Sequence, residues 1–314
     1  MMPPKPHRIS LSLGLLALYL LTLPVYGLLR LTNQSQALSM MTVIIIVLFF
    51  SASMAHLLES RGMRHAALMA GCAFIISLAA EMFGVATGMM FGNYTYSEQL
   101  GPRVLGLVPL IIPVAWMMML YPSYAIALHL TNRLTRSDDF SRLSMRNPIS
   151  ERYESRHALP EIGLLGILTA KAITTVVAAL AMTMWDLSLD PRMVHDGNWV
   201  WHDGGPYLGI PITNFVGWFL TACVIFIIWQ AVDNHRSDDF SRPHRMTTEV
   251  VTTMRGNLPI YAYIIQWVAE SVANIVFWGN PLVGVAVFIG MGIFSVPAIL
   301  RLRAMRVSSA QQND

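Results

Sequence analysis

The stretch FGNYTYSEQLGP at Phe91–Pro102 has a near copy, DGNWVWHDGGP, at Asp196–Pro206. Both read Gly-Asn, an aromatic residue, any residue and a second aromatic residue, followed by an acid and Gly-Pro. The heptapeptide RSDDFSR also occurs twice, at 136–142 and at 236–242. Matches that keep the same order over this distance indicate an internal duplication, with copies at about 66–142 and 162–242.

The composition is that of a membrane protein. Of the 314 residues, 54% are hydrophobic and only 12% are charged, and the mean hydropathy is +0.51. A soluble domain carries about twice that share of charged residues. The two cysteines, Cys72 and Cys223, lie inside apolar runs, so we expect neither a disulfide framework nor a redox motif.

Eight apolar stretches are long enough to cross the hydrocarbon core of a bilayer. They predict an all-α polytopic integral membrane protein with a single transmembrane domain, in which spans 3–4 and 5–6 are the duplicated hairpins. We expect the first span to be a retained helix and not a cleaved signal peptide. The stretches are residues 9–29, 38–58, 66–91, 104–130, 162–189, 209–232, 258–278 and 281–300.

The basic residues predict the orientation of these spans. With the N-terminus inside, seventeen of the 21 Lys and Arg residues fall in cytoplasmic segments, and only Arg30, Arg103 and Arg192 fall in outer loops. The positive-inside rule then places both termini in the cytoplasm, with 301–314 as a cytoplasmic tail, in a multi-pass protein of the plasma (inner) membrane.

Each duplicated hairpin carries an acid before its outer Gly-Asn turn: Glu81 aligns with Asp186 without a gap. A carboxyl group that faces lipid is costly, so these acids should face the interior of the bundle. Asp190 lies one helical turn after Asp186, and Asn214 lies in the first turn or two of span 6. On span 7, Gln266, Glu270 and Asn274 form a polar stripe. We therefore expect one polar chamber shared by spans 3, 5, 6 and 7, although each acid could instead form an interhelical hydrogen bond.

The missing motifs narrow the chemistry. The nine histidines show no paired spacing of the membrane di-iron enzymes, and no GxGxxG or GxxxxGK[ST] is present. The sequence thus predicts no metal site and no cofactor. Protonatable acids in an aromatic-walled chamber suit proton-driven chemistry on an apolar alkene. A carboxylic acid would protonate the double bond, aromatic faces would stabilise the cation, and water would add with a second group as base.

Two segments, residues 81–116 and 185–218, resemble the carotenoid biosynthesis hydratases of the CruF type. The second segment is the more specific. It holds Trp185-Asp186, Leu189-Asp190-Pro191, Trp199-x-Trp201, Gly209-Ile210-Pro211 and Asn214-Phe215 with Gly217-Trp218, as the family has them. The resemblance implies a hydro-lyase that adds water across the terminal 1,2 double bond of an acyclic carotenoid and gives a tertiary alcohol. Relatives act similarly on C50 precursors in bacterioruberin-type pathways.

The resemblance also implies the site. The candidate catalytic residues are Glu81, Asp186, Asp190 and Asn214. The candidate substrate-binding residues are Tyr94, Tyr96, Trp185, Trp199, Trp201 and Trp218, to which the stripe on span 7 adds Glu270 and Asn274. The expected partners are a lycopene-, γ-carotene- or C50-type carotenoid, the lipid bilayer and other membrane enzymes of the carotenoid pathway, and no nucleic acid.

Two other readings stay open. Asp186 and Asp190 are spaced to hold Mg²⁺ and a diphosphate in a membrane prenyltransferase or isoprenoid lyase. Parallel repeats with intramembrane acids also occur in transport proteins, and a carotenoid-binding protein without enzymatic activity would share the aromatic walls.

Overall fold

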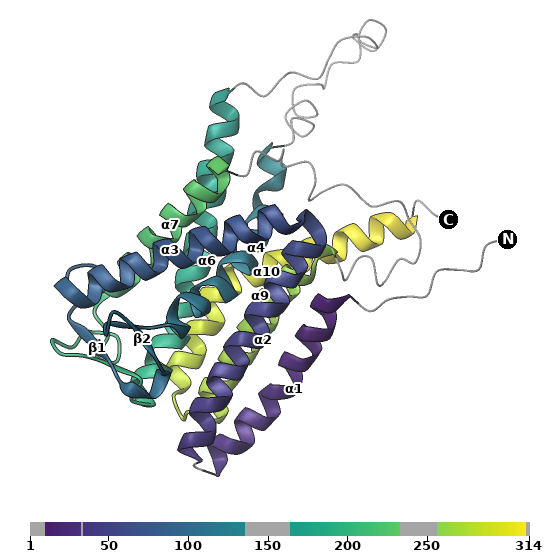
Figure 1. The fold of residues 1–314 in the computed structure, drawn as a ribbon. Helices are drawn as coiled ribbons and strands as arrows, with labels where there is room; N and C mark the ends of the chain where they lie inside the picture. The colour runs from purple at the N-terminus through teal and green to yellow at the C-terminus, as the bar shows by residue number, and fades with distance from the viewer. Residues whose placement is uncertain (1–9, 33, 136–163, 233–255, 312–314) are drawn as a thin grey trace, which may run out of the picture.

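The computed structural model describes residues 10–32, 34–135, 164–232 and 256–311. Both RSDDFSR segments lie outside the described residues. The described chain forms eight α-helices, one 3-10 turn and four short strands (Figure 1). In chain order these are α1 (Leu11–Leu31), α2 (Ser35–Arg61), α3 (Met63–Thr87), β1 (Tyr94–Tyr96), η1 (Glu98–Leu100), β2 (Arg103–Val104), β3 (Val108–Pro109), α4 (Ile111–Thr135), α6 (Leu164–His195), β4 (Trp199–Trp201), α7 (Ile212–Val232), α9 (Leu258–Val276) and α10 (Pro281–Gln311).

Seven of the described helices are long and apolar enough to cross a membrane, which makes this a multi-pass membrane protein. The eighth expected span, α9, is a helix, but its polar stripe at Gln266, Glu270 and Asn274 leaves it outside this group of seven. Large apolar side chains such as Leu21 and Ile75 point outward, 67% exposed in both cases, whereas polar side chains are buried inside the bundle. The interior is itself largely apolar, and the apolar outer surface with inward-facing polar groups is what a lipid solvent requires.

Two helix ends differ from the expectation. The fifth span was expected to end at residue 189, before Pro191, but α6 continues to His195. Proline removes one backbone hydrogen bond from a helix without always ending it, and Asp190 is therefore a helical residue. Likewise α10 extends to Gln311, so most of the expected tail at 301–314 is the end of a long helix.

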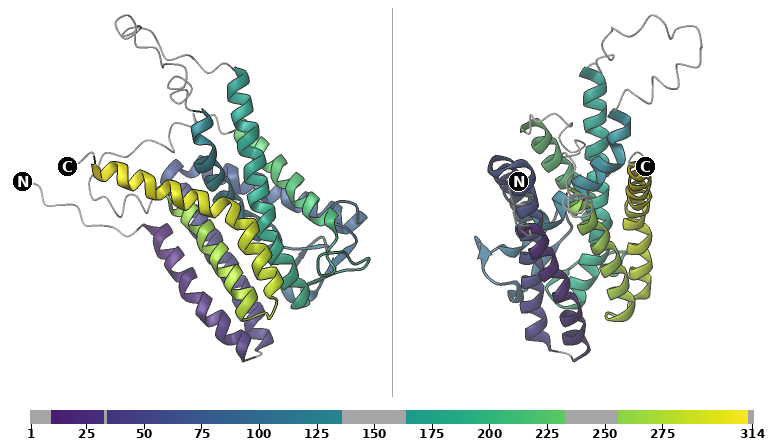
Figure 2. Two further views of the ribbon diagram at one scale, coloured as in Figure 1. Left: turned by 180° about the vertical axis from the view of Figure 1, so that it is seen from behind. Right: turned by 90° about the vertical axis from the view of Figure 1, so that its right-hand side faces the viewer.

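The two predicted hairpins pack together in a symmetric way. Helix α3 packs on α7, and α4 packs on α6, so that the first helix of each hairpin contacts the second helix of the other. Helices α2, α9 and α10 pack against this group of four, and α1 lies against α2 (Figure 2). The start of α1 and the end of α10 lie at the end of the bundle opposite β1 (Figure 1).

Residues that correspond in the two copies meet across this interface. Trp116 stacks on Trp218, with ring centroids 4.0 Å apart and planes at 13°. The non-glycine residues with positive φ in the described chain are Leu105 and Leu208, which also correspond. A pseudo-twofold axis between two copies of one hairpin would bring equivalent residues together in this way. The stacked tryptophans and the shared backbone conformation are features that a duplication predicts, and the duplication itself stays a prediction from the sequence.

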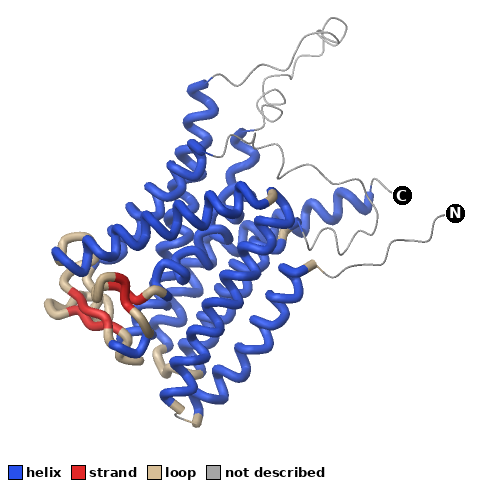
Figure 3. The backbone as a smooth tube through the Cα atoms, viewed as in Figure 1, coloured by secondary structure: helices blue, strands red, loops and turns tan. Residues whose placement is uncertain are grey.

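The Gly-Asn turns do not simply connect helices at the membrane surface. Gly88 ends α3 in the left-handed conformation (φ +69°), and the chain then folds back towards the bundle. At Gly92 (φ +88°) a Cβ atom would lie 2.7 Å from the Pro211 ring, so only glycine fits there. Strands β1 and β4 pair as an antiparallel ribbon at one end of the molecule, drawn in red in Figure 3.

Candidate active site

The ribbon presents four aromatic side chains to the interior. Tyr94 pairs with Trp201 and Tyr96 with Trp199, and these four side chains are buried. Thr95 and Val200, between them, are exposed, as the alternation of a strand requires. These four aromatic side chains therefore form an inward-facing cover, made by one strand from each predicted hairpin.

Glu81 lies directly beneath this cover and is 3% exposed. Its Oε2 accepts hydrogen bonds from the hydroxyls of Tyr94 (2.5 Å) and Tyr96 (2.7 Å). Its Oε1 accepts one from the indole Nε1 of Trp116 (3.0 Å). Burial opposes the ionised form of this carboxyl group, and the three converging donors are what stabilise that form against the cost of burial.

The two tyrosines can only serve as donors while they keep their protons. Burial, followed by the charge of Glu81, raises the pKa of Tyr94 and of Tyr96 well above the ordinary value for tyrosine. Both hydroxyls therefore remain protonated at physiological pH and continue to donate to Glu81.

Asp186 and Asp190 lie on consecutive turns of α6 and are both almost fully buried. The Asn214 amide, from the first turn of α7, donates to Oδ2 of Asp186 (2.9 Å) and to Oδ2 of Asp190. Asp186 Oδ1 has no hydrogen-bond partner among the described residues. Two ionised carboxyl groups so close together repel each other, so in the resting site the pair is expected to share one proton.

In the turn of α6 that carries these acids, a side-chain hydrogen bond replaces a backbone one. Pro191 lacks the amide hydrogen that would bond to the carbonyl oxygen of Leu187. The hydroxyl of Tyr207 donates to that oxygen instead (2.8 Å), and the Tyr207 ring packs edge-to-face on Phe215, next to Asn214. Burial, and then the charges of the two aspartates, raise the pKa of Tyr207 to about 12.

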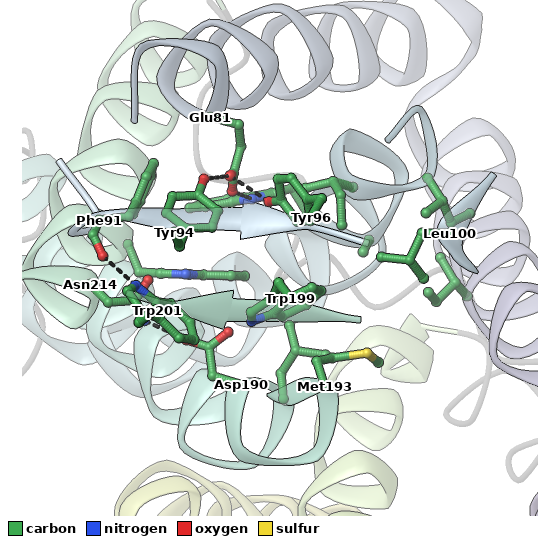
Figure 4. Close-up of a pocket in the computed structure, with 17 residues that line it drawn as sticks. Glu81, Phe91, Tyr94, Tyr96, Leu100, Asp190, Met193, Trp199, Trp201 and Asn214 are labelled. Carbon is green, nitrogen blue, oxygen red and sulfur yellow. Dashed lines mark hydrogen bonds between the residues drawn. The ribbon is translucent and has the colours of Figure 1, made fainter. Parts of the chain in front are cut away.

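A cavity of about 30 Å³ lies between Glu81 and Asp190, which face it from opposite sides (Figure 4). That volume holds one or two water molecules. The acids and Asn214 lie towards one end, and Leu100 lies at the other end (Figure 4). The remaining lining is almost wholly aromatic or aliphatic: Ile46, Phe91, Tyr94, Tyr96, Ile111, Ile112, Ala115, Trp116, Leu189, Met193, Trp199, Trp201 and Trp218.

Most of the residues predicted from the sequence come together here. Those that line the cavity are Glu81, Tyr94, Tyr96, Asp190, Trp199, Trp201, Asn214 and Trp218. Asp186 does not line the cavity, but it shares the Asn214 amide with Asp190, which does. Trp185 is buried against Trp218, with centroids 6.0 Å apart, and does not line the cavity.

The polar stripe of α9 belongs to a different cluster, which differs from the single chamber expected. Glu270 accepts hydrogen bonds from Ser188 (2.7 Å) and Gln266 (2.7 Å) and forms an ion pair with Arg192 (3.2 Å). Asn274 also donates to Ser188 (2.7 Å). Helical periodicity correctly places these polar residues on one face, but that face meets another side of α6, so Glu270 and Asn274 do not line the cavity.

Several lining residues were missed. Trp116 donates to Glu81, and its correspondence with Trp218 in the repeat was the signal that could have identified it. Phe91 fits between two glycines, because a Cβ atom on Gly84 or Gly217 would lie 2.5 or 2.6 Å from its ring. Ile46 comes from α2, outside the repeat, and nothing in the sequence marked it.

Within the described ranges, no three His, Cys, Asp or Glu side chains come together as metal ligands. The spacing of Asp186 and Asp190 left a Mg²⁺ site open. In the structure the Asn214 amide nitrogen, a hydrogen-bond donor, lies between their Oδ2 atoms. This arrangement is better suited to holding a proton than a divalent cation.

Comparison with known proteins gives two matches. A family model described as carotenoid biosynthesis protein matches residues 41–293. A protein named bisanhydrobacterioruberin hydratase, from Haloarcula japonica, is 27% identical over 167 residues, which cover 53% of this chain and 45% of that protein. The match thus spans less than half of the relative's length. No solved structure matches.

Proposed function

The chain belongs to the carotenoid biosynthesis protein family, and from this premise we propose that it is a carotenoid 1,2-hydratase. The substrate would be an acyclic carotenoid end, and the product a tertiary alcohol. The observation that carries the proposal is the pair of unlike acid sites that face each other across an aromatic cavity. The similar Haloarcula japonica protein is also named a hydratase, which supports the proposal.

In the first step the aspartate pair supplies a proton. Asp190 is the member of the pair that lines the cavity, so its carboxyl group donates to the terminal double bond. The π electrons form the new C–H bond at C2, and the positive charge remains on the tertiary C1. Asp186 and Asn214 position this group: after the transfer, the Asn214 amide still donates to both carboxyl groups.

The surrounding rings stabilise the cation. The faces of Tyr and Trp rings attract positive charge through their quadrupoles, most strongly when water is excluded. The stacked pair Trp116 and Trp218 and the ring of Trp201 all line the cavity. The ionised Glu81 adds a negative charge on the side opposite Asp190.

Water then completes the reaction. A water molecule held by Glu81 attacks C1, and Glu81 accepts the proton that the water releases. The product has gained one H₂O in total, with one hydrogen from Asp190 and the hydroxyl group from water. A proton passed from Glu81 back to the aspartate pair, through water, restores the starting state, so no oxidant or reductant is consumed.

The cavity also suits the two substrates in its polarity. Leu100 lies at the end away from the acids, and the lining also includes the aliphatic side chains of Ile46 and Ile112, as a polyene chain requires, whereas water suits the acid end. The cavity is smaller than an isoprenoid end, so binding must displace lining side chains. The arginine distribution supports an orientation in the plasma membrane in which the ribbon faces the outside and both termini lie in the cytoplasm.

The experiment is expression in cells that make lycopene or another carotenoid with open ends. Pigments are extracted, separated by chromatography and weighed by mass spectrometry. We expect a product heavier by one water, or by two if both ends react. Pigment that co-purifies chemically unchanged would favour a carotenoid-binding protein, and unchanged pigment from every acyclic donor would refute the proposal.

A further inference from the structure

A second hollow lies on the other side of the ribbon from the acids. It is an open hollow of about 420 Å³, lined by Thr95, Tyr96, Ser97, Val194, Gly197, Trp199 and Val200. Two of these residues, Tyr96 and Trp199, also line the cavity that holds the acids. A single layer of side chains therefore separates the hollow from the cavity.

That layer consists of one cross-strand aromatic pair. Tyr96 and Trp199 are opposite each other in the register of β1 and β4. Their rings meet edge to face, with centroids 5.6 Å apart and planes at 84°. Such an edge-to-face contact adds only a small energy to the area that it buries, so motion of these two rings alone would open a path between the two spaces.

The hollow and the end of the cavity away from the acids differ in chemistry. The wall of the hollow includes the hydroxyl-bearing side chains of Thr95 and Ser97. Next to it in the chain, Asp196 forms an ion pair with Arg30 of α1 (2.9 Å) and Glu98 forms one with Arg103 (2.9 Å). Charged and hydroxyl groups of this kind require water around them. The hollow is therefore on the aqueous side of the ribbon.

We propose that this hollow is the port through which the substrate water reaches the acids, past the Tyr96–Trp199 pair. The inference rests on the proposed hydratase function and gives it separate routes for its two substrates: water through the ribbon, and the polyene from the end at Leu100. Tyr96 donates to Glu81 (2.7 Å), so water that passes this ring arrives beside the group that activates it.

The test is a reversible plug. Val200 lines the hollow and is 49% exposed, whereas Leu105, in the corresponding loop, is 81% exposed and lines neither space. Val200→Cys and Leu105→Cys are made in a Cys72→Ala, Cys223→Ala background. Each is labelled with a bulky, water-soluble thiosulfonate and then released with a reducing agent.

Two readouts are taken from each protein. The first is the hydration rate, measured together with the amount of bound carotenoid. The second needs no activity: it is the exchange in D₂O of the ¹⁵N-labelled indole N–H of Trp116, which points at Glu81 inside the cavity. The internal control is Trp267, whose indole N–H donates to Phe288 O (2.9 Å) in another part of the bundle.

On labelling at Val200→Cys, we expect hydration and Trp116 exchange to fall by about tenfold or more and to recover on reduction, because closing a site excludes water. Bound carotenoid, Trp267 exchange and the labelled Leu105→Cys protein should not change. Complete labelling at Val200→Cys that leaves Trp116 exchange unchanged would overturn the water port. Slowed exchange in a protein that hydrates no carotenoid would support the port and refute the proposed function instead.

Discussion

Tyr207→Phe tests whether the position of the acid pair depends on the hydrogen bond from Tyr207 to the carbonyl oxygen of Leu187 in α6. The substitution removes one hydroxyl and keeps the ring, which packs on Phe215. The carbonyl oxygen of Leu187 then has no donor, because Pro191 has no amide hydrogen and the Tyr207 hydroxyl, which donates to it in the wild type, is gone. The turn between Asp186 and Asp190 loses a fixed point.

The magnitude follows from the loss of one hydrogen bond to a protein carbonyl group. An acceptor left unsatisfied away from water costs about 1–3 kcal/mol. Part of that cost is relieved if the turn tilts and finds another donor. Such a tilt moves Asp190, and a misplacement of about 1 Å at a reacting group lowers a rate by about a hundredfold. We therefore expect a modest loss of stability and a larger loss of hydration.

The chain offers a matched control. Pro122 in α4 frees the carbonyl oxygen of Met118 in the same way, and the Ser53 hydroxyl donates to it (3.2 Å). None of these three residues lines the cavity. Ser53→Ala should cost a similar free energy of unfolding, by the same physical cause, and leave the hydration rate close to that of the wild type.

The assay compares both variants with the wild type in detergent, by denaturant titration and by initial rates of product formation. Because the pKa of Tyr207 is about 12, its hydroxyl is intact throughout the usable range. The deficit of Tyr207→Phe should therefore be constant between about pH 6 and 9. Equal losses of activity in Tyr207→Phe and Ser53→Ala would refute the positioning role.

Three further predictions concern the walls of the site. Trp116→Phe removes one donor to Glu81 and should lower the hydration rate by about tenfold, since a hydrogen bond to a charged group is worth about 1.5–3 kcal/mol; wild-type kinetics would count against an ionised Glu81. Ile46→Trp overfills the cavity and should abolish product and carotenoid binding at some cost in stability, with the protein still folded; normal turnover would place the polyene elsewhere. Glu270→Gln leaves the buried Arg192 guanidinium without its counter-charge and should destabilise the fold by about 3–5 kcal/mol, with the pH–rate profile unaltered; a shifted profile would connect this cluster to the chemistry.

The sequence predicted the parts of the site that follow from local spacing. The intramembrane cost of a carboxyl group places Glu81, Asp186 and Asp190 inside the bundle, and the repeat indicates which residues correspond. Both inferences need only the sequence itself: the hydropathy of each span and the alignment of its two copies. The convergence of Glu81 with the aspartate pair agrees with the expectation, because helices of two adjacent hairpins bring their inward faces together.

The remainder depended on contacts between distant segments. The Gly-Asn turns gave no sign that β1 and β4 would pair with each other, since that pairing joins residues about a hundred positions apart. Pro191 suggested a helix end, but Tyr207 supplies the missing hydrogen bond and α6 continues. The stripe that contains Glu270 showed which residues share a face of α9, not which neighbour that face would meet.

The central claim is that water is added across a double bond by acids on opposite walls of one cavity. Its most direct test is the reaction in H₂¹⁸O with the wild type and with Asp190→Asn, followed by mass analysis of the carotenoid. We predict one ¹⁸O atom in each tertiary alcohol formed by the wild type, and no alcohol from Asp190→Asn although the protein is folded and binds pigment. An alcohol without ¹⁸O, or undiminished product from Asp190→Asn, would contradict the claim.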